Sequence, residues 1–205
     1  MNCLEIFCGT KSFGKCCNEL GYNVISIDIE KQFNPTHLCD IMDFNYKQYD
    51  KDYFDIIWAS PPCTEYSKAK SVGIRDIEGA NKIVLKTIEI INYFNCKEWF
   101  IENPQTSLLK KQSFMNDYKY VDGDYCMYGL PYRKRTRIWT NKIYEEEPLQ
   151  LCNKECGSFI DGRHIGSCGC GGQGQGHNKS YSNKSYSLLE KYAIPEELIY
   201  SLIMC

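Results

Sequence analysis

Two things are missing from this sequence of 205 residues: an apolar run of membrane-spanning length, and a marked excess of charge of one sign. A transmembrane helix needs about 20 consecutive apolar residues, so we expect no membrane-embedded protein. The formal net charge of −2 provides no general attraction to nucleic acid. The start, Met1 to Phe7, has an early acid and no basic cluster, so no secretory signal is expected and we predict an intracellular protein.

Cysteine, by contrast, is abundant and present in an odd number, because the chain contains 13. Without an export signal, reduced thiols, a metal site or a catalytic thiol explain this number better than a framework of disulfides. Hydrophobic residues make up 43% and charged residues 24%, which is typical of a soluble globular protein. At this length the chain fits one domain with a sizeable core.

Short apolar runs alternate with segments of helical spacing in the first half of the chain. Strands are predicted at residues 3–7, 24–27, 36–39, 54–59 and 99–102, and helices at 12–20, 80–94 and 194–203. Ser12 is the expected N-cap of the first helix, and Pro195 stands near the first turn of the last. This alternation indicates an α/β protein with a doubly wound, mainly parallel sheet. A further strand is predicted at 138–140.

The segment Ser60-Pro61-Pro62-Cys63 directly follows the apolar run at 54–59. Ligands of open α/β sheets bind at the carboxyl edge of the strands, where this cysteine is expected to lie. Two consecutive prolines restrict the backbone, so a rigid loop presents the thiol in the way that a nucleophile requires. Residues 64–79 are polar and form a predicted mobile loop beside it.

Glu102-Asn103-Pro104 ends the next predicted strand and brings a carboxylic acid to the same edge. The basic stretch 133–137 contains Arg135 and Arg137, either of which can lower the pKa of the Cys63 thiol. Taken alone, Glu102 can be a surface acid and the arginines a solvated edge. The three elements together are better explained as one catalytic site.

Three earlier strand ends carry groups that suit a cofactor. Phe7-Cys8-Gly9 leads into a helix, whose first backbone N–H groups attract polar ligands. Asp28 ends the second strand, where a carboxylate can accept hydrogen bonds from a ribose diol, and Asp40 ends the third, within reach of an adenine amino group. The alternative is that Gly9 only makes a turn and that the two acids only cap strands.

These motifs resemble those of the C5-cytosine-specific DNA methyltransferase family over nearly the whole chain except residues 141–190. The basic stretch after Gly129-Leu130-Pro131 and the C-terminal segment 194–199 also resemble family motifs, and the latter is expected to fold back against the cofactor. The resemblance implies a Rossmann-like S-adenosylmethionine methyltransferase sheet with a small irregular insert. It implies S-adenosylmethionine contacts at Phe7, Gly9, Thr10, Asp28, Asp40, Ile41 and Pro61, and catalytic roles at Cys63, Glu102, Arg135 and Arg137.

The chemistry that the resemblance implies begins with attack of the Cys63 thiolate on C6 of cytosine, which makes C5 carbanion-like. Glu102 is expected to hold N3 and Arg135 to contact O2 during this step. The reacting atoms are inaccessible in a stacked duplex, so the implied partner is DNA with a flipped-out or single-stranded cytosine. The loop 64–79 is expected to close over that base.

The sequence departs from the family pattern in its first motif, where paired glycines are replaced by Lys11 and Ser12, and at Arg133 and Thr64. The large target-recognition region of the family is reduced to an insert. We therefore expect a catalytic core at 1–140, a Cys- and Gly-rich insert at 141–190 and a helix at 191–205 that returns to the core. Phage and giant-virus members are similarly compact, and a viral member would act in the host cytoplasm or nucleus.

The insert contains residues that can hold a structural zinc ion: Cys152, Cys156, His164 and Cys168. Thiolate and imidazole are the usual ligands of tetrahedral zinc, and a segment this polar would gain stability from a metal. The spacing differs from the usual Cys-x2-Cys pair, so unligated thiols are the alternative.

Three rival functions are compatible with parts of the sequence. An amino-directed methyltransferase would need neither a thiol at position 63 nor Glu102, so it is disfavoured. A tRNA cytosine C5-methyltransferase shares the chemistry, and the basic stretch does not separate it from a DNA enzyme. A non-catalytic nucleic-acid-binding remnant of the fold is opposed by the presence of Cys63, Glu102 and Arg135.

Overall fold

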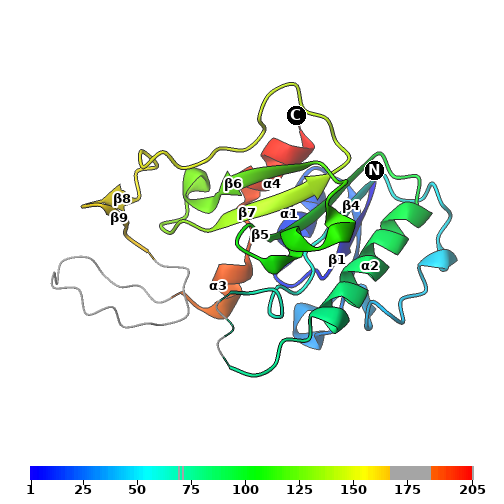
Figure 1. Ribbon diagram of the computed structural model, residues 1–205. Helices are drawn as coiled ribbons and strands as arrows, with labels where there is room; N and C mark the ends of the chain where they lie inside the picture. The colour runs from blue at the N-terminus through cyan, green and yellow to red at the C-terminus, as the bar shows by residue number, and fades with distance from the viewer. Residues whose placement is uncertain (69, 71, 167–185, 205) are drawn as a thin grey trace.

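The structure, a computed structural model, describes residues 1–68, 70, 72–166 and 186–204. Its centre is a seven-stranded sheet with the order β3-β2-β1-β4-β5-β7-β6 (Figure 1). The strands are β1 (Asn2–Ile6), β2 (Asn23–Asp28), β3 (His37–Leu38), β4 (Ile56–Ala59), β5 (Glu98–Pro104), β6 (Tyr120–Asp124) and β7 (Arg135–Thr140). The first five run parallel to one another, and β7 pairs antiparallel with both β5 and β6. The mainly parallel sheet expected from the sequence is confirmed.

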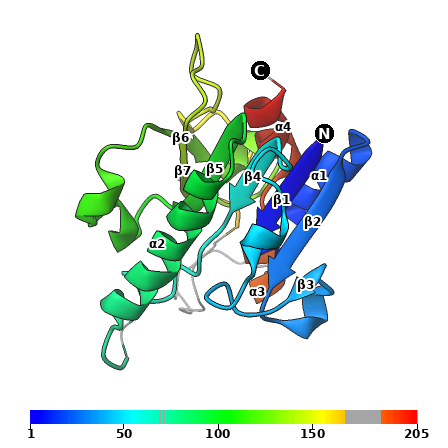
Figure 2. The ribbon, with the colours of Figure 1, turned by 90° about the vertical axis from the view of Figure 1, so that its right-hand side faces the viewer.

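Helices cover both faces of this sheet. Helix α2 (Ile77–Tyr93) lies on one face, and α1 (Ser12–Glu19) and α4 (Glu196–Ile203) lie on the other (Figure 2). Alternate strand residues divide between these layers, because successive side chains of a strand point to opposite faces. Ile57 and Ile101 belong to the core under α2, whereas Trp58 and Phe100 pack with Phe13 of α1. In the described part of the chain, no helix has the length and apolar character that a bilayer crossing requires.

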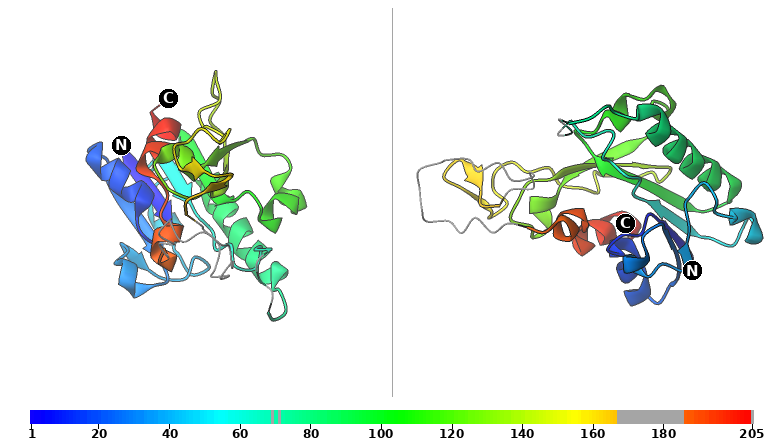
Figure 3. Two further views of the ribbon diagram at one scale, coloured as in Figure 1. Left: turned by 90° about the vertical axis from the view of Figure 1, so that its left-hand side faces the viewer. Right: turned by 90° about the horizontal axis from the view of Figure 1, so that it is seen from below.

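Shorter elements complete the chain. A short helix, α3 (Leu188–Tyr192), precedes α4. The 3-10 helices are η1 (Lys31–Phe33), η2 (Tyr46–Gln48), η3 (Leu108–Lys111), η4 (Ser113–Met115) and η5 (Tyr125–Tyr128). Strands β8 (Phe159–Ile160) and β9 (Arg163–His164) form a separate small hairpin that projects beyond β6 and β7 (Figure 3).

Two helix starts differ from the sequence prediction. Ser12 is not the N-cap of α1, because Lys11 holds that position with a left-handed φ of 58°. The Ser12 hydroxyl instead accepts a hydrogen bond from the Ile194 N–H at 3.0 Å. Helix α2 begins at Ile77, earlier than predicted, because the Asp76 carboxylate caps it by accepting from the Gly79 N–H at 2.8 Å.

Glu5 is a buried acid on the face of β1 that α1 covers. Only 3% of it is exposed, and its Oε2 has no hydrogen-bond partner among the described residues. A Cβ at Gly14 would come within 2.6 Å of that oxygen, so a side chain there would force the Glu5 carboxyl group to shift. Burial raises the pKa of Glu5 to about 7, although backbone N–H groups of Gly14 and Phe13 oppose the shift.

A raised carboxyl pKa predicts a stability that falls as pH rises. Between the ordinary value of 4.5 and about 7, the folded chain binds more protons at Glu5 than the unfolded chain does. Glu5→Gln removes the ionisable group, and with it the loss of stability as pH rises. The free energy of unfolding of the variant, relative to the wild type, should therefore increase by about 2.5 kcal/mol from about pH 5 to about pH 8 in urea titrations. Glu146→Gln, at an exposed position, is the control; a Glu5→Gln difference that is independent of pH would contradict the prediction.

Candidate active site

Cys63 lies on a loop at the carboxyl edge of the sheet, directly after β4 ends at Ala59. The loop is fixed at two points. The Ser60 N–H donates to the Ile6 carbonyl oxygen at 3.2 Å, and the Asn103 side-chain amide donates to the Pro61 carbonyl oxygen at 2.9 Å. Cys63 itself is half-buried. The loop therefore leaves the thiol partly accessible while its backbone is tied to β1 and β5.

Glu102 points from β5 to the face of the sheet that carries α1 and α4, and its carboxylate is buried. The Thr136 hydroxyl donates a short hydrogen bond to its Oε1. The Tyr125 hydroxyl donates to the same oxygen at 3.4 Å. Two residues that sequence reasoning missed, Tyr125 and Thr136, thus fix one oxygen of the predicted catalytic acid.

Cys63 and Glu102 are close enough to interact electrostatically. Burial raises the pKa of the Cys63 thiol first, and the negative charge of Glu102 raises it further. The positive charge of Lys134 opposes both effects. The Lys134 ammonium group lies 4.6 Å from the centre of the Tyr125 ring and donates to the Lys191 carbonyl oxygen at 3.0 Å.

The basic group whose charge lowers the pKa of the Cys63 thiol is Lys134, in place of the Arg135 or Arg137 expected from the sequence. The antiparallel register sets Glu102 opposite Ile138, so Lys134 and Thr136 share the face of Glu102 and the two arginines occupy the other face. There Arg135 binds the Asp124 carboxylate at 2.9 and 2.6 Å. Arg137 binds Asp122, with both hydrogen bonds at 2.8 Å.

The turn after β1 brings together the first cofactor candidates. Phe7, Gly9 and Lys11 all have left-handed backbones, with φ of 60°, 44° and 58°. This conformation costs a residue with a side chain about 1–2 kcal/mol, and such strain concentrates at functional sites. Asp28 accepts hydrogen bonds from the N–H of Gly9 and of Glu30, both at 2.9 Å. The carboxylate at the end of β2 is thereby held against the turn.

The remaining cofactor candidates border the same edge. Asp40 is exposed after β3, where its Oδ1 accepts from the Met42 N–H at 2.9 Å, and Ile41 beside it is buried. Thr10 Oγ1 lies 3.0 Å from Ser12 Oγ, the atom that also binds the Ile194 N–H. The C-terminal segment thus contacts the start of α1, and its position against the cofactor stays a prediction.

Three of the four predicted metal ligands come together. Cys152, Cys156 and His164 lie with Cys126, and their ligand atoms are all within 4.8 Å of one another. Cys168, the fourth predicted ligand, lies outside the described residues. Cys126 was not predicted, because it lies far from the insert in sequence and belongs to η5.

A comparison with protein-family models matches residues 1–119 to the C-5 cytosine-specific DNA methylase model. The chain belongs to the C-5 cytosine-specific DNA methylase family. The matched part contains the Phe7–Lys11 turn, Cys63 and Glu102, and it ends before β7. Over an alignment of 226 residues the chain is also 28% identical to a probable DNA (cytosine-5)-methyltransferase of Frog virus 3 (isolate Goorha). That alignment covers 99% of each sequence.

Solved methyltransferase structures share the fold. A putative DNA modification methyltransferase encoded within an E. coli prophage superposes with a TM-score of 0.51 at 14% identity, over 68% of this chain. A Spodoptera frugiperda DNMT2 mutant superposes with a TM-score of 0.50 at 18% identity, over 71% of this chain. The matches cover 46% and 52% of those two chains, so this chain spans about half their length. The fold class expected from the sequence is confirmed.

The opposed charges around Cys63 predict two variants with opposite effects. Glu102→Gln should lower the pKa of the Cys63 thiol and increase its alkylation by iodoacetamide below that pKa, whereas Lys134→Gln should slow it. Each unit of pKa change alters the rate by about threefold, since the gain in thiolate is partly offset by lower nucleophilicity. Peptide mass spectrometry follows Cys63 separately from the other cysteines. Lys111→Gln, an equal charge change on η3, is the control; shifts of the same sign in both variants would refute the assignment.

Proposed function

We propose that the protein transfers a methyl group from S-adenosylmethionine to C5 of cytosine in DNA, through a covalent bond between Cys63 and C6 of the base. The observation that carries this proposal is the position of a half-buried thiol within electrostatic reach of a buried, hydrogen-bonded carboxyl group. Membership of the family supports it, because the matched residues include both groups.

Attack of the Cys63 thiolate forms the S–C6 bond and moves the electrons of the 5,6 double bond towards C5. Glu102 would hold N3 by a hydrogen bond or donate its proton there, which stabilises the charge that develops on the ring. C5 would then bond to the methyl carbon, as the bond from that carbon to the sulfonium sulfur of S-adenosylmethionine breaks and leaves a neutral thioether. The C5 proton would leave to a base, and the S–C6 bond would break as the 5,6 double bond returns. Cys63 is thereby regenerated.

The same carboxyl group would also make the nucleophile responsive to substrate. The charge of Glu102 raises the pKa of the Cys63 thiol and so favours its neutral form. When a proton taken up from solvent is shared between the Glu102 carboxylate and N3 of a cytosine, the negative charge beside the thiol decreases, and with it the repulsion of a thiolate. Arrival of the base would therefore favour the thiolate, while Lys134 provides a constant opposite charge.

The edge formed by β1, β2 and β3 fits S-adenosylmethionine. The left-handed turn Phe7–Lys11 brings Phe7, Gly9 and Thr10 to this edge. Asp28 already accepts two backbone hydrogen bonds, but a carboxylate has about four acceptor sites and can still bind a ribose hydroxyl. Asp40, Ile41 and Pro61 border the same edge. When bound, S-adenosylmethionine supplies an electrophilic methyl group.

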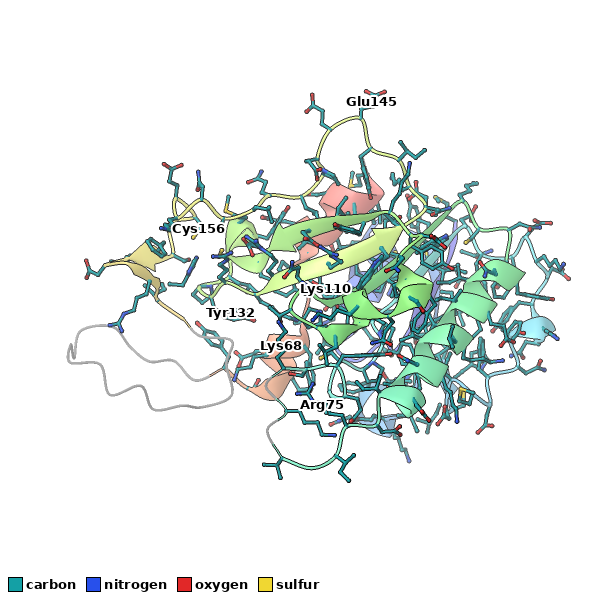
Figure 4. The ribbon with its side chains drawn as sticks, in the orientation of Figure 1. Lys68, Arg75, Lys110, Tyr132, Glu145 and Cys156 are labelled. Carbon is teal, nitrogen blue, oxygen red and sulfur yellow. The ribbon has the colours of Figure 1, made fainter. Side chains whose placement is uncertain are left out.

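A polyanionic partner is favoured by a cluster of basic residues on the α2 side of the sheet. Burial lowers the pKa of Lys110 first, and the neighbouring charges of Arg137 and Lys68 lower it further. Figure 4 labels Lys68 and Lys110. Contacts with the phosphates of a nucleic acid would relieve the repulsion between these basic groups. The target cytosine would have to be flipped out or single-stranded to reach Cys63. An Arg135 contact with O2 of the base stays a prediction of the resemblance.

Each part of the chain would have its own task. Residues 1–140 would form the catalytic core, the insert at 141–190 would contribute to target recognition, and 191–205 would return to the cofactor edge. Family membership favours DNA over tRNA as substrate and favours catalysis over a non-catalytic remnant.

A covalent trap tests the proposal. Oligonucleotides with 5-fluorocytosine, which cannot lose its C5 substituent, are incubated with the protein and labelled S-adenosylmethionine. An adduct should form on DNA, withstand denaturing electrophoresis and disappear in Cys63→Ala, while Cys96→Ala, remote from the site, should retain it. Glu102→Gln should reduce the rate of adduct formation by about 100-fold or more, because general acid catalysis typically contributes that much.

The outcomes separate the alternatives. An adduct on RNA of matched sequence, with none on DNA, would assign the enzyme to the tRNA class. An adduct on DNA that persists in Cys63→Ala would remove Cys63 as the nucleophile. No adduct on either substrate would favour the non-catalytic remnant.

A further inference from the structure

Four potential metal ligands meet where the insert contacts the catalytic sheet. Cys126 comes from η5, which follows β6; Cys152 and Cys156 come from the first part of the insert; His164 ends strand β9. Their ligand atoms lie within 4.8 Å of one another. Figure 4 shows Cys156 beside the β8–β9 hairpin, away from the centre of the sheet. Cys126 is buried, and the other three are partly buried.

The distances agree with one tetrahedral ion. His164 Nε2 lies 3.5 Å from Cys152 Sγ and 3.4 Å from Cys156 Sγ. Zinc binds sulfur at about 2.3 Å and imidazole nitrogen at about 2.0 Å, so tetrahedral angles place the two ligand atoms about 3.5 Å apart. The three cysteines are free thiols rather than members of disulfides. Three thiolates with one imidazole is a common ligand set of closed structural zinc sites.

The backbone around the cluster donates a hydrogen bond to sulfur, as suits a thiolate ligand. The Lys154 N–H donates to Cys152 Sγ at 3.3 Å, and such outer hydrogen bonds stabilise charged sulfur ligands. Lys154 itself has a left-handed φ of 80°, which is unusual for a residue with a side chain. The turn therefore adopts a strained conformation that directs an N–H group at a candidate ligand.

We propose that Cys126, Cys152, Cys156 and His164 bind one structural zinc ion that fastens the insert to the catalytic sheet. This differs from the ligand set predicted from sequence, because Cys126 of the sheet side takes the place of Cys168. An ion bound by ligands of the insert alone would stabilise only the insert. An ion that has Cys126 among its ligands instead couples the fold of the insert to the end of β6.

The attachment extends to residues near the predicted site. The buried Asp124 carboxylate accepts from the Cys152 N–H at 2.9 Å and also holds the Arg135 guanidinium. Beyond the cluster, the Gly166 N–H donates to the Pro131 carbonyl oxygen at 2.8 Å. Zinc would thus fix the position of the insert relative to Arg135 and to the turn before β7. The inference concerns metal binding and holds whether or not the methyl-transfer proposal is correct.

Metal analysis of the reduced full-length protein tests the site. Protein produced with zinc in the medium and purified without chelators should contain about one zinc ion per chain by plasma mass spectrometry. Cys126→Ser, Cys156→Ser and His164→Ala should each lose the bound zinc. Cys96→Ser and Cys168→Ser should retain it and serve as matched controls.

A second test uses the wild-type protein, so its result does not depend on whether these variants fold. Cobalt(II) added to the metal-free reduced chain should give the strong visible absorption of a tetrahedral thiolate site, which one equivalent of zinc should abolish. Neither bound zinc nor this spectrum would overturn the proposal. Zinc lost in Cys168→Ser but kept in Cys126→Ser, or a disulfide between Cys152 and Cys156 in place of a metal, would overturn it as well.

Discussion

A buried hydrogen bond, from the Asn103 side-chain amide to the Pro61 carbonyl oxygen, ties the loop of Cys63 to the strand that carries Glu102. Asn103 is 1% exposed, so loss of its amide would leave a carbonyl group without a partner, at a cost of about 1–3 kcal/mol. Because strand residues alternate between faces, Asn103 anchors the cysteine loop from one face while Glu102 projects from the other. The loop of the nucleophile and the strand of the acid therefore cannot move independently.

The strand ends could be predicted from the sequence because each apolar run closes on a polar, glycine or proline residue. This located Cys63 and Glu102 at one edge. The faces of the basic residues could not be predicted, since a shift of one residue in register exchanges Lys134 with Arg135. Nor did the sequence predict β6, which contains Gly123 and two aspartates and has little of the apolar alternation of a strand.

The metal ligands, too, could be predicted only in part from the sequence. Spacing within the insert pointed to Cys152, Cys156 and His164, because local patterns reveal ligands that lie near one another in the chain. Cys126 joins them only after the antiparallel turn of β6 and β7 has brought η5 to the insert. The network around Asp124 has the same origin, since its partners Arg135 and Cys152 are contributed by separate segments.

The proposed catalysis depends on addition of the Cys63 thiolate to C6 of cytosine. Such addition makes C5 basic enough to exchange its hydrogen with water, even without a methyl donor. Release of tritium from DNA labelled at cytosine C5 is therefore the most direct measurement. We expect release with the wild-type protein alone and none above background with Cys63→Ala. Equal release by both proteins, or none by the wild type on DNA that it binds, would contradict this mechanism.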